Sequence, residues 1–264
     1  RLCVLDCVSI DPEVSICIGS AWVAGEDGSK SVLIQDTTAS ETYATIFFSG
    51  PMMTFLGVSC THSGSERPWR GAGHHIMLYQ CYGRYTASNG KTAITRHGGD
   101  FFWVSECEFD SRDASAALTT VGLGHSSSGK YINVNHVVFE RNLCWANEAL
   151  PAISMKPKNQ SVIDCMVRNN ICIGTILIGA AASDEIADGI AVLHNTISST
   201  TLATRITVRD YYGSVVIQNN LSIGYQAGVP TSPETVRVSN TTLSESAAPE
   251  VTGNVMPVAY LNRD

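Results

Sequence analysis

Two basic residues, Lys156 and Arg209, recur at the same point of a repeating pattern. Each lies 14 residues after an asparagine, Asn142 or Asn195, that occupies the same place in its own repeat. A row of cations on an otherwise acidic protein attracts a polyanionic chain and neutralises its carboxylates. Neutralising a carboxylate acidifies the proton on the neighbouring carbon, so that a base can remove it. The spacing predicts that Lys156 and Arg209 serve as the base or the carboxylate clamp of such a proton abstraction.

Other polar residues accompany these cations at the ends of predicted strands. His97 or Tyr211 is predicted to donate a proton to the leaving oxygen, and His97 completes the catalytic set with Lys156 and Arg209. The substrate-binding set is predicted to be Arg96, Lys158, Asp210, Tyr211 and His125. His125 lies in the glycine-rich segment 122–129, just past its predicted strand, where a functional loop would lie. The alternative is that these residues are solvated strand ends, charged to keep the surface soluble.

Carboxylates and histidines leave two other chemistries to consider. An inverting hydrolase needs two carboxyl groups with room for a water molecule between them, and Asp210 has no evident partner. A group of acids could hold Ca²⁺ through oxygen atoms, although a D-x-D-x-D-G loop is missing; it comprises Glu106, Glu108, Asp110 and Asp113. The adjacent histidines His74 and His75 would point to opposite faces of a strand, so they rarely reach one ion. Calcium is therefore the only cofactor considered, and no metal ligands are assigned.

These residues depend on a repeat that begins at His136. Its aligned asparagines are spaced by 28, 25 and 25 residues and are Asn142, Asn170, Asn195 and Asn220. A fixed period of this length is the signature of stacked coils. Each coil reads as a first strand, a turn holding the asparagine, a short second strand, a variable loop and a third strand, with a rise of about 4.8 Å per coil. In the third strands, Ile153 and Met155 are predicted to point inward, and Ser154 and Lys156 outward.

The asparagine column predicts a buried ladder. A side-chain amide at a tight turn can bond the backbone of its own turn and of the next coil. Cys81 and Cys107 hold the same position in the earlier coils, and Cys144 and Cys172 fall in register two residues after the ladder. The chain has nine cysteines and no C-x-x-C pair, which predicts free and mostly buried thiols.

With its asparagine turns, coils of about 25 residues and the repeated V-V-I-x-N-N phrase, the chain resembles the right-handed parallel β-helix, or pectin-lyase-like, superfamily over residues 50–243. The resemblance implies an all-β fold, a right-handed single-stranded parallel β-helix of about 7–9 coils with three short strands per coil. It also implies that the ladder lies between the second and third sheets. The strands ending at Lys156 and Arg209 then belong to the first sheet, beside which family members usually bind polysaccharide.

The 264 residues are predicted to form one β-helix domain, with irregular N-terminal coils at 1–52, regular coils at 53–243 and a C-terminal tail at 244–264. Early strands are expected at 14–18, 31–35 and 44–48. Third strands are expected at 92–96, 117–121, 152–156, 176–179, 205–209 and 236–239. No amphipathic helix is predicted to cover the first coil, so uncapped coil ends offer a route to oligomerisation.

The net charge of −7 makes nucleic-acid binding unfavourable, and no run of 18 apolar residues predicts a membrane span. An acidic polysaccharide is the expected partner, and an extracellular or cell-surface location is the expected setting. The leading hypothesis is a polysaccharide lyase that cleaves a uronate-containing glycan by β-elimination. A non-catalytic glycan-binding or structural module, like a tailspike or adhesin, is the first alternative, and a polygalacturonase-like hydrolase is the second.

Overall fold

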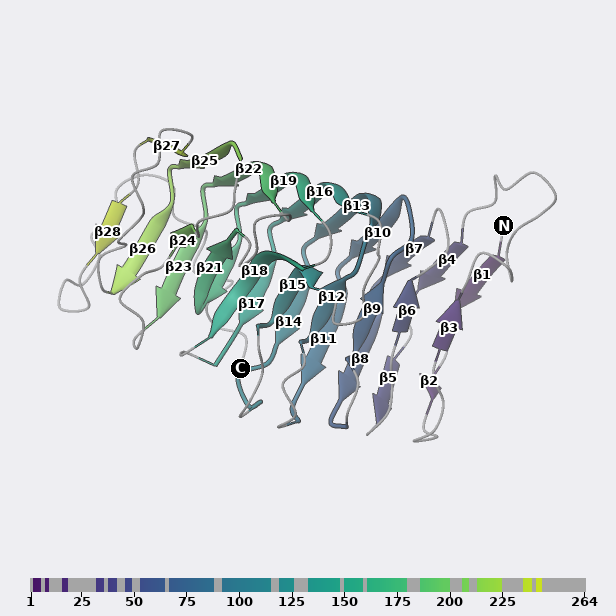
Figure 1. The fold of residues 1–264 in the computed structure, drawn as a ribbon. Coiled ribbons are helices and arrows are strands. Elements are labelled where there is room, and N and C mark those ends of the chain that lie inside the picture. The colour runs from purple at the N-terminus through teal and green to yellow at the C-terminus, as the bar shows by residue number, and fades with distance from the viewer. Residues whose placement is uncertain are drawn as a thin grey trace.

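The computed structural model is a stack of β-strand coils (Figure 1). It describes residues 2–5, 8–9, 16–18, 32–35, 38–41, 46–48, 53–64, 67–87, 92–114, 119–125, 133–147, 150–158, 161–179, 186–199, 206–208, 213–224, 235–238 and 241–243. Within these ranges every regular element is a strand. Consequently, this part of the chain contains no helix that is long and apolar enough to cross a membrane.

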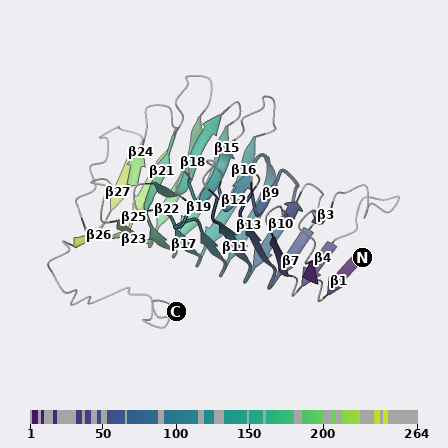
Figure 2. The ribbon, with the colours of Figure 1, turned by 90° about the horizontal axis from the view of Figure 1, so that it is seen from below.

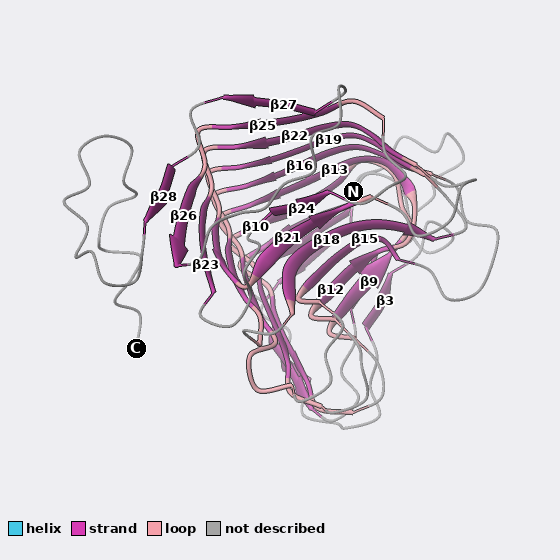
Figure 3. Cartoon of the chain, turned by 60° about the vertical axis from the view of Figure 1, so that its left-hand side comes forward, coloured by secondary structure: helices cyan, strands magenta, loops and turns pink. Residues whose placement is uncertain are grey.

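The strands form three sheets, named here A, B and C (Figure 3). Sheet A contains, in order, β1 (Leu2–Leu5), β4 (Val32–Gln35), β7 (Met53–Leu56), β10 (Ile76–Tyr79), β13 (Gly99–Ser105), β16 (Val134–Glu140), β19 (Val162–Arg168), β22 (Ala187–Leu193), β25 (Val215–Gln218) and β27 (Thr235–Val238). Sheet B contains β2 (Val8–Ser9), β5 (Thr38–Glu41), β8 (Ser59–His62), β11 (Tyr82–Tyr85), β14 (Glu108–Asp110), β17 (Leu143–Trp145), β20 (Ile171–Ile173), β23 (Thr196–Ser199), β26 (Leu221–Gly224) and β28 (Thr241–Leu243). Sheet C contains β3 (Ile16–Ile18), β6 (Ile46–Phe48), β9 (Trp69–Gly71), β12 (Ile94–Arg96), β15 (Val121–His125), β18 (Pro151–Lys158), β21 (Thr175–Ile178) and β24 (Ile206–Val208).

Each strand pairs in parallel with the strand three elements later, so that one coil contributes one strand to every sheet. Viewed from below, the strands follow one another along a single stack axis (Figure 2). In the described part of the chain, the eight strands of sheet C mark eight coils that contain all three strands. The strand pairing confirms the predicted all-β parallel β-helix with three short strands per coil. The early strands β4, β5 and β6 pair directly with β7, β8 and β9.

Two strand predictions in sheet C were wrong. Residues 236–239 were predicted as a third strand, but β27 (Thr235–Val238) pairs with β25 in sheet A, because the connection between these coils is shorter than the repeat period. The segment Gly122–His125 was predicted to be a loop that follows a strand at 117–121. It is instead most of β15, whose Val121 pairs with Ile94 and Ile153 on the neighbouring coils.

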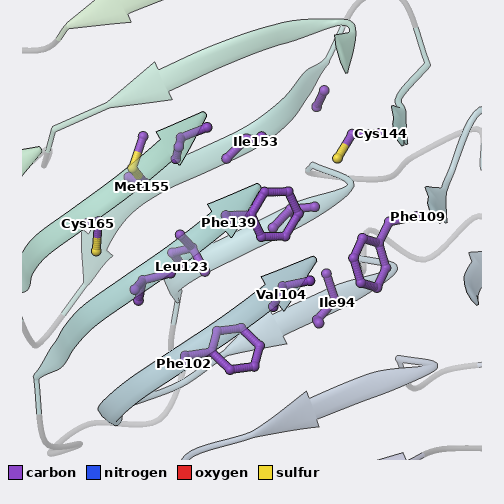
Figure 4. Packing of buried hydrophobic residues seen from close by; sticks show 14 of the residues in the cluster. Ile94, Phe102, Val104, Phe109, Leu123, Phe139, Cys144, Ile153, Met155 and Cys165 are labelled. Atoms are coloured by element: carbon purple, nitrogen blue, oxygen red, sulfur yellow. The ribbon is translucent and has the colours of Figure 1, made fainter. Parts of the chain in front are cut away.

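The core is a column of apolar side chains inside the coils (Figure 4). Phe102, Val104, Phe139 and Ile153 are almost completely buried, and Met155 is as well. Alternation along each strand sends every second side chain inward, so equivalent residues of successive coils stack on one another. The predicted inward orientation of Ile153 and Met155 is confirmed.

The asparagine ladder lies at the turn between sheets A and B and is buried, as predicted. The Asn170 side-chain oxygen accepts bonds from the backbone nitrogen of Asn142 at 2.9 Å and from its side-chain nitrogen at 3.1 Å. The Asn170 side-chain nitrogen donates to the carbonyl of Phe139 at 2.9 Å and to the Asn195 side-chain oxygen at 3.0 Å. Asn195 and Asn220 repeat this pattern. Each amide therefore satisfies polar atoms of two neighbouring coils.

The cysteine predictions are confirmed for the described residues. Six cysteines are free and buried: Cys60, Cys81, Cys107, Cys144, Cys165 and Cys172. Cys107 continues the ladder, because its backbone nitrogen donates to the Asn142 side-chain oxygen at 2.8 Å. Cys144 and Cys172 pair in register. Burial raises the pKa of Cys60 and of Cys165 to about 12, so these thiols are protonated and chemically inert at neutral pH.

Candidate functional site

The predicted catalytic residues follow one register line of sheet C. Arg96 pairs with Leu123, which pairs with Met155. Met155 pairs with Ile178, and Ile178 pairs with Val208. The residues that come next in the sequence are His97, Gly124, Lys156, Gly179 and Arg209. We name these five positions the strand-end row.

Glycines alternate with the ionisable residues of this row. Gly124 and Gly179 both have positive φ, 75° and 103°. They carry no side chain, so the coils on either side of Lys156 place nothing over its flanks. Every second coil thus presents an ionisable position, at a repeat of about 10 Å. This is the spacing on which the prediction of a shared register for Lys156 and Arg209 depended.

Several predicted site residues fall outside the described part of the chain. They are Arg209, Asp210 and Tyr211, together with the side chains of Lys156, Lys158 and His125. The backbone of β18 includes both lysines, and His125 pairs with Lys158 after a register shift. Their predicted roles remain predictions.

Arg96 contradicts its predicted outward orientation. Its side chain is 0% exposed and lies inside the coil, because it alternates with Thr95 and follows Ile94 into the core. The guanidinium packs 4.8 Å from the ring centroid of Phe102 and 5.9 Å from that of Phe48. It donates hydrogen bonds to the carbonyls of Gly73 and Asp100. Because a glycan outside the coil cannot reach it, the structure does not support a substrate-binding role for Arg96.

The burial of Arg96 predicts a change in stability. Desolvation lowers the pKa of Arg96 to about 9, yet the group remains charged at neutral pH, and its Nε and one terminal nitrogen are buried without a hydrogen-bond partner. We expect Arg96→Met to raise the free energy of unfolding by about 1–3 kcal/mol, because an apolar side chain of similar length removes a buried charge. Arg96→Ala should instead lower it by about 2–4 kcal/mol through the cavity it leaves. Urea denaturation distinguishes the two, and a Met variant as unstable as the Ala variant would contradict the prediction.

The middle of the outer face of sheet C is covered. Thr95 is 0% exposed, Ser154 4% and Leu177 8%, although alternation turns all three away from the core. His97, at the strand end, is partly exposed, and its backbone nitrogen donates to the Gly71 carbonyl at 2.8 Å. The strand-end row, rather than the middle of the strands, is therefore the part of this face that a polymer could reach.

The predicted acidic patch consists of ion-paired carboxylates. Asp110 is buried and accepts hydrogen bonds from the side chain of Arg112 at 3.0 Å, and Asp113 pairs with Arg84 at 2.5 Å. Glu106 accepts a bond from the Tyr79 hydroxyl at 2.8 Å. Among the described side chains, no group of three or more histidine, cysteine or acidic residues is arranged to hold a metal ion. These contacts give a calcium site no support in the described residues.

The sequence analysis missed the outer face of sheet A. Phe101 is 49% exposed and stacks between His75 and His136, with centroid distances of 4.6 and 4.8 Å. The Nε2 atom of His136 lies 3.6 Å from the Asp164 carboxylate. All four residues have φ near 53° and lie six positions before a ladder residue. That constant offset was the signal that could have found this column, which we name the ring column.

Beside the ring column runs a row of charged residues held in a network. Glu140 is 3% exposed, and it accepts bonds from Arg168 at 2.6 Å and from the Trp103 indole nitrogen at 3.1 Å. Arg141 contacts the same carboxylate at 3.1 Å. Burial alone would raise the pKa of Glu140, but the bonds from Arg168 and Trp103 and the nearby positive charges lower it. Glu140 is therefore ionised at neutral pH.

Comparisons with known proteins return distant structural likenesses. No protein-family model matches the chain, and no curated protein does. A glycoside hydrolase has a TM-score of 0.40 and 8% identity, over 78% of this chain and 38% of that chain. A tailspike protein of the E. coli bacteriophage HK620, in complex with a pentasaccharide, has a TM-score of 0.37 and 15% identity, over 93% and 60%. The A-module of the Azotobacter vinelandii mannuronan C-5 epimerase AlgE4 has a TM-score of 0.31 and 10% identity, over 87% and 85%.

This chain therefore spans 38% and 60% of the first two of these structures. Their printed descriptions name carbohydrate-active or carbohydrate-bound proteins, and one parallel β-helix scaffold hosts many chemistries. An activity for this chain has to come from its own residues.

Proposed function

We propose that the protein binds an acidic polysaccharide along the strand-end row and cleaves it by β-elimination. The single observation that supports this proposal is the register of sheet C, which puts His97, Lys156 and Arg209 two coils apart on one line with glycine between them. A regular line of cationic positions matches a polymer that carries a carboxylate on each sugar. The protein as a whole is acidic, with a net charge of −7, so the attraction would be local to this row.

The proposed reaction uses two protein groups for two proton transfers. One of Lys156 and Arg209 neutralises the uronate carboxylate, and the other removes the proton from the carbon that bears it. The electron pair of that C–H bond forms a carbon–carbon double bond as the bond to the glycosidic oxygen in the β-position breaks. His97 or Tyr211 supplies a proton to the departing oxygen. The products are a new reducing end and an unsaturated uronate.

The test is to incubate the protein with alginate, pectate, glycosaminoglycans and neutral glycans, with and without calcium. Ultraviolet absorbance of the unsaturated uronate and the release of reducing ends are followed in parallel. The proposal predicts that both signals rise together on at least one acidic polymer. Reducing ends without absorbance would identify a hydrolase. Binding without either signal would identify a glycan-binding module, and either result would overturn the elimination.

A further inference from the structure

The outer face of sheet A carries an unbroken apolar line. The residues that pair along it on six successive coils are Met77, Trp103, Val138, Met166, Ala191 and Val216. All six are at least partly exposed, and Trp103 is 37% exposed. The solvent face of a one-sided sheet normally alternates to polar residues, so a line of this length needs an occupant. We name it the apolar stripe.

Residue size along this face is uneven. The first coils carry the large side chains of Met77, Trp103 and Phe101, whereas the later coils carry Ala191 and Gly189. A flat partner would leave gaps over the small residues. A partner with the opposite gradient would fill them, because facing layers pack best when large residues meet small ones.

We propose that this partner is a second copy of the chain, packed face to face with its stack axis reversed. The two-fold axis runs parallel to the strands and passes between β16 and β19. It puts Trp103 opposite the partner's Ala191, Met77 opposite the partner's Val216 and Val138 opposite the partner's Met166. In the ring column the same rotation sets Phe101 opposite the partner's Gly189.

Charge follows the same symmetry. The rotation sets His136 opposite the partner's Asp164, and Glu140 opposite the partner's Arg168. Both pairs already exist within the chain, at 3.6 and 2.6 Å. Across the axis they would join into rings of alternating sign at the centre of the contact, on both sides of the apolar stripe. A like-charged contact, Asp100 with the partner's Asp188, falls on the outer edge of the face, where solvent screens it.

A parallel arrangement, with the axis along the stack, is the competing symmetry. It would set every stripe residue against its own copy, so Trp103 would meet Trp103 and Ala191 would meet Ala191. The charges would still match, because Asp164 would face Arg168. The distribution of residue sizes, and not the charges, therefore selects the reversed arrangement. Because the contact is isologous, it closes as a dimer.

The first test is a size swap, with mass measured by sedimentation equilibrium and folding by circular dichroism. Trp103→Ala is expected to raise the dimer dissociation constant at least about 30-fold, the effect of losing a buried aromatic anchor. Ala191→Trp should weaken the dimer as well, because two large side chains then meet. The double variant Trp103→Ala/Ala191→Trp should restore the dimer, since each large residue again faces a small one. Ala191→Ser is the matched control and should leave the mass unchanged.

The second test fixes the direction of the two stacks. Val138→Cys and Met166→Cys are prepared separately and treated with a short bis-maleimide crosslinker, with the parent protein as control for its own thiols. The reversed arrangement predicts covalent dimers when the two variants are mixed, and little crosslinking of either alone. Crosslinking of Val138→Cys with itself would overturn the reversed arrangement. A monomer at every concentration, or a monomer whose Trp103 fluorescence responds to a glycan, would overturn the dimer.

Discussion

Asn170→Ala is expected to lower the free energy of unfolding by about 3–5 kcal/mol. The substitution removes an amide that makes four buried hydrogen bonds, to Asn142, Phe139 and Asn195. It leaves the backbone nitrogen of Asn142 and the carbonyl of Phe139 without their partners inside the coil. Each such buried group costs about 1–3 kcal/mol because water cannot replace the lost bond.

Asn133→Ala is the matched control for this loss. Asn133 also bonds across one coil, since its side-chain oxygen accepts from the backbone nitrogen of Ser161 at 3.0 Å, but that contact is exposed. We expect a change below about 1 kcal/mol there, because water takes over the bond. Urea denaturation followed by circular dichroism measures both. Equal effects would contradict the view that burial gives the ladder its weight.

Lys156→Met is expected to reduce the rate of unsaturated-uronate formation by about 100- to 10,000-fold. The substitution keeps an unbranched side chain of similar length, so it removes the charge and the proton acceptor with little change of shape. A loss in kcat at unchanged KM would assign Lys156 as the base. A rise in KM with kcat preserved would assign it as the carboxylate clamp.

Arg84→Met controls for the general loss of one positive charge. Arg84 is on sheet B, partly exposed and paired with Asp113, so it lies on a different sheet from the strand-end row. Its replacement should leave the lyase rate within about twofold, since surface ion pairs contribute little. If both variants lost activity equally, the overall field of the protein rather than Lys156 would carry the effect.

The ladder was predictable from sequence because its cause is local and repeats. Asn142, Asn170 and Asn195 each satisfy the same backbone groups, so the same residue returns whenever the turn returns. The positive φ of the residue just before each ladder position, such as Arg141 and Asn169, belongs to the same turn. A pattern set by one turn is readable in one dimension.

The orientation of Arg96 was not predictable from the ladder. Arg96 lies 15 residues after Cys81, whereas its partner in register, Met155, lies 13 residues after Asn142. The variable loop of the earlier coil is two residues longer, so counting from the ladder assigned the wrong position. Loop length is free to change because these loops lie outside the paired strands.

The exposed face of sheet A was missed for a different reason. Alternation assigns Phe101 to a strand interior, but its φ of 54° interrupts the strand and turns the ring outward. The interruption recurs at His136 and Asp164, each unpaired between two paired residues. Residue types so different hide a backbone feature that they share. Size and charge on this face become meaningful only when the coils are stacked.

The central claim, that the strand-end row is where an acidic polysaccharide is bound, is tested most directly by a crystal structure of the Lys156→Met variant with a uronate oligosaccharide. Slow turnover in this variant would hold the intact chain in place. The account predicts density along the ends of β12, β15, β18 and β21, with sugar carboxylates facing His97 and Arg209. Density over the apolar stripe of sheet A, or over sheet B, would contradict it.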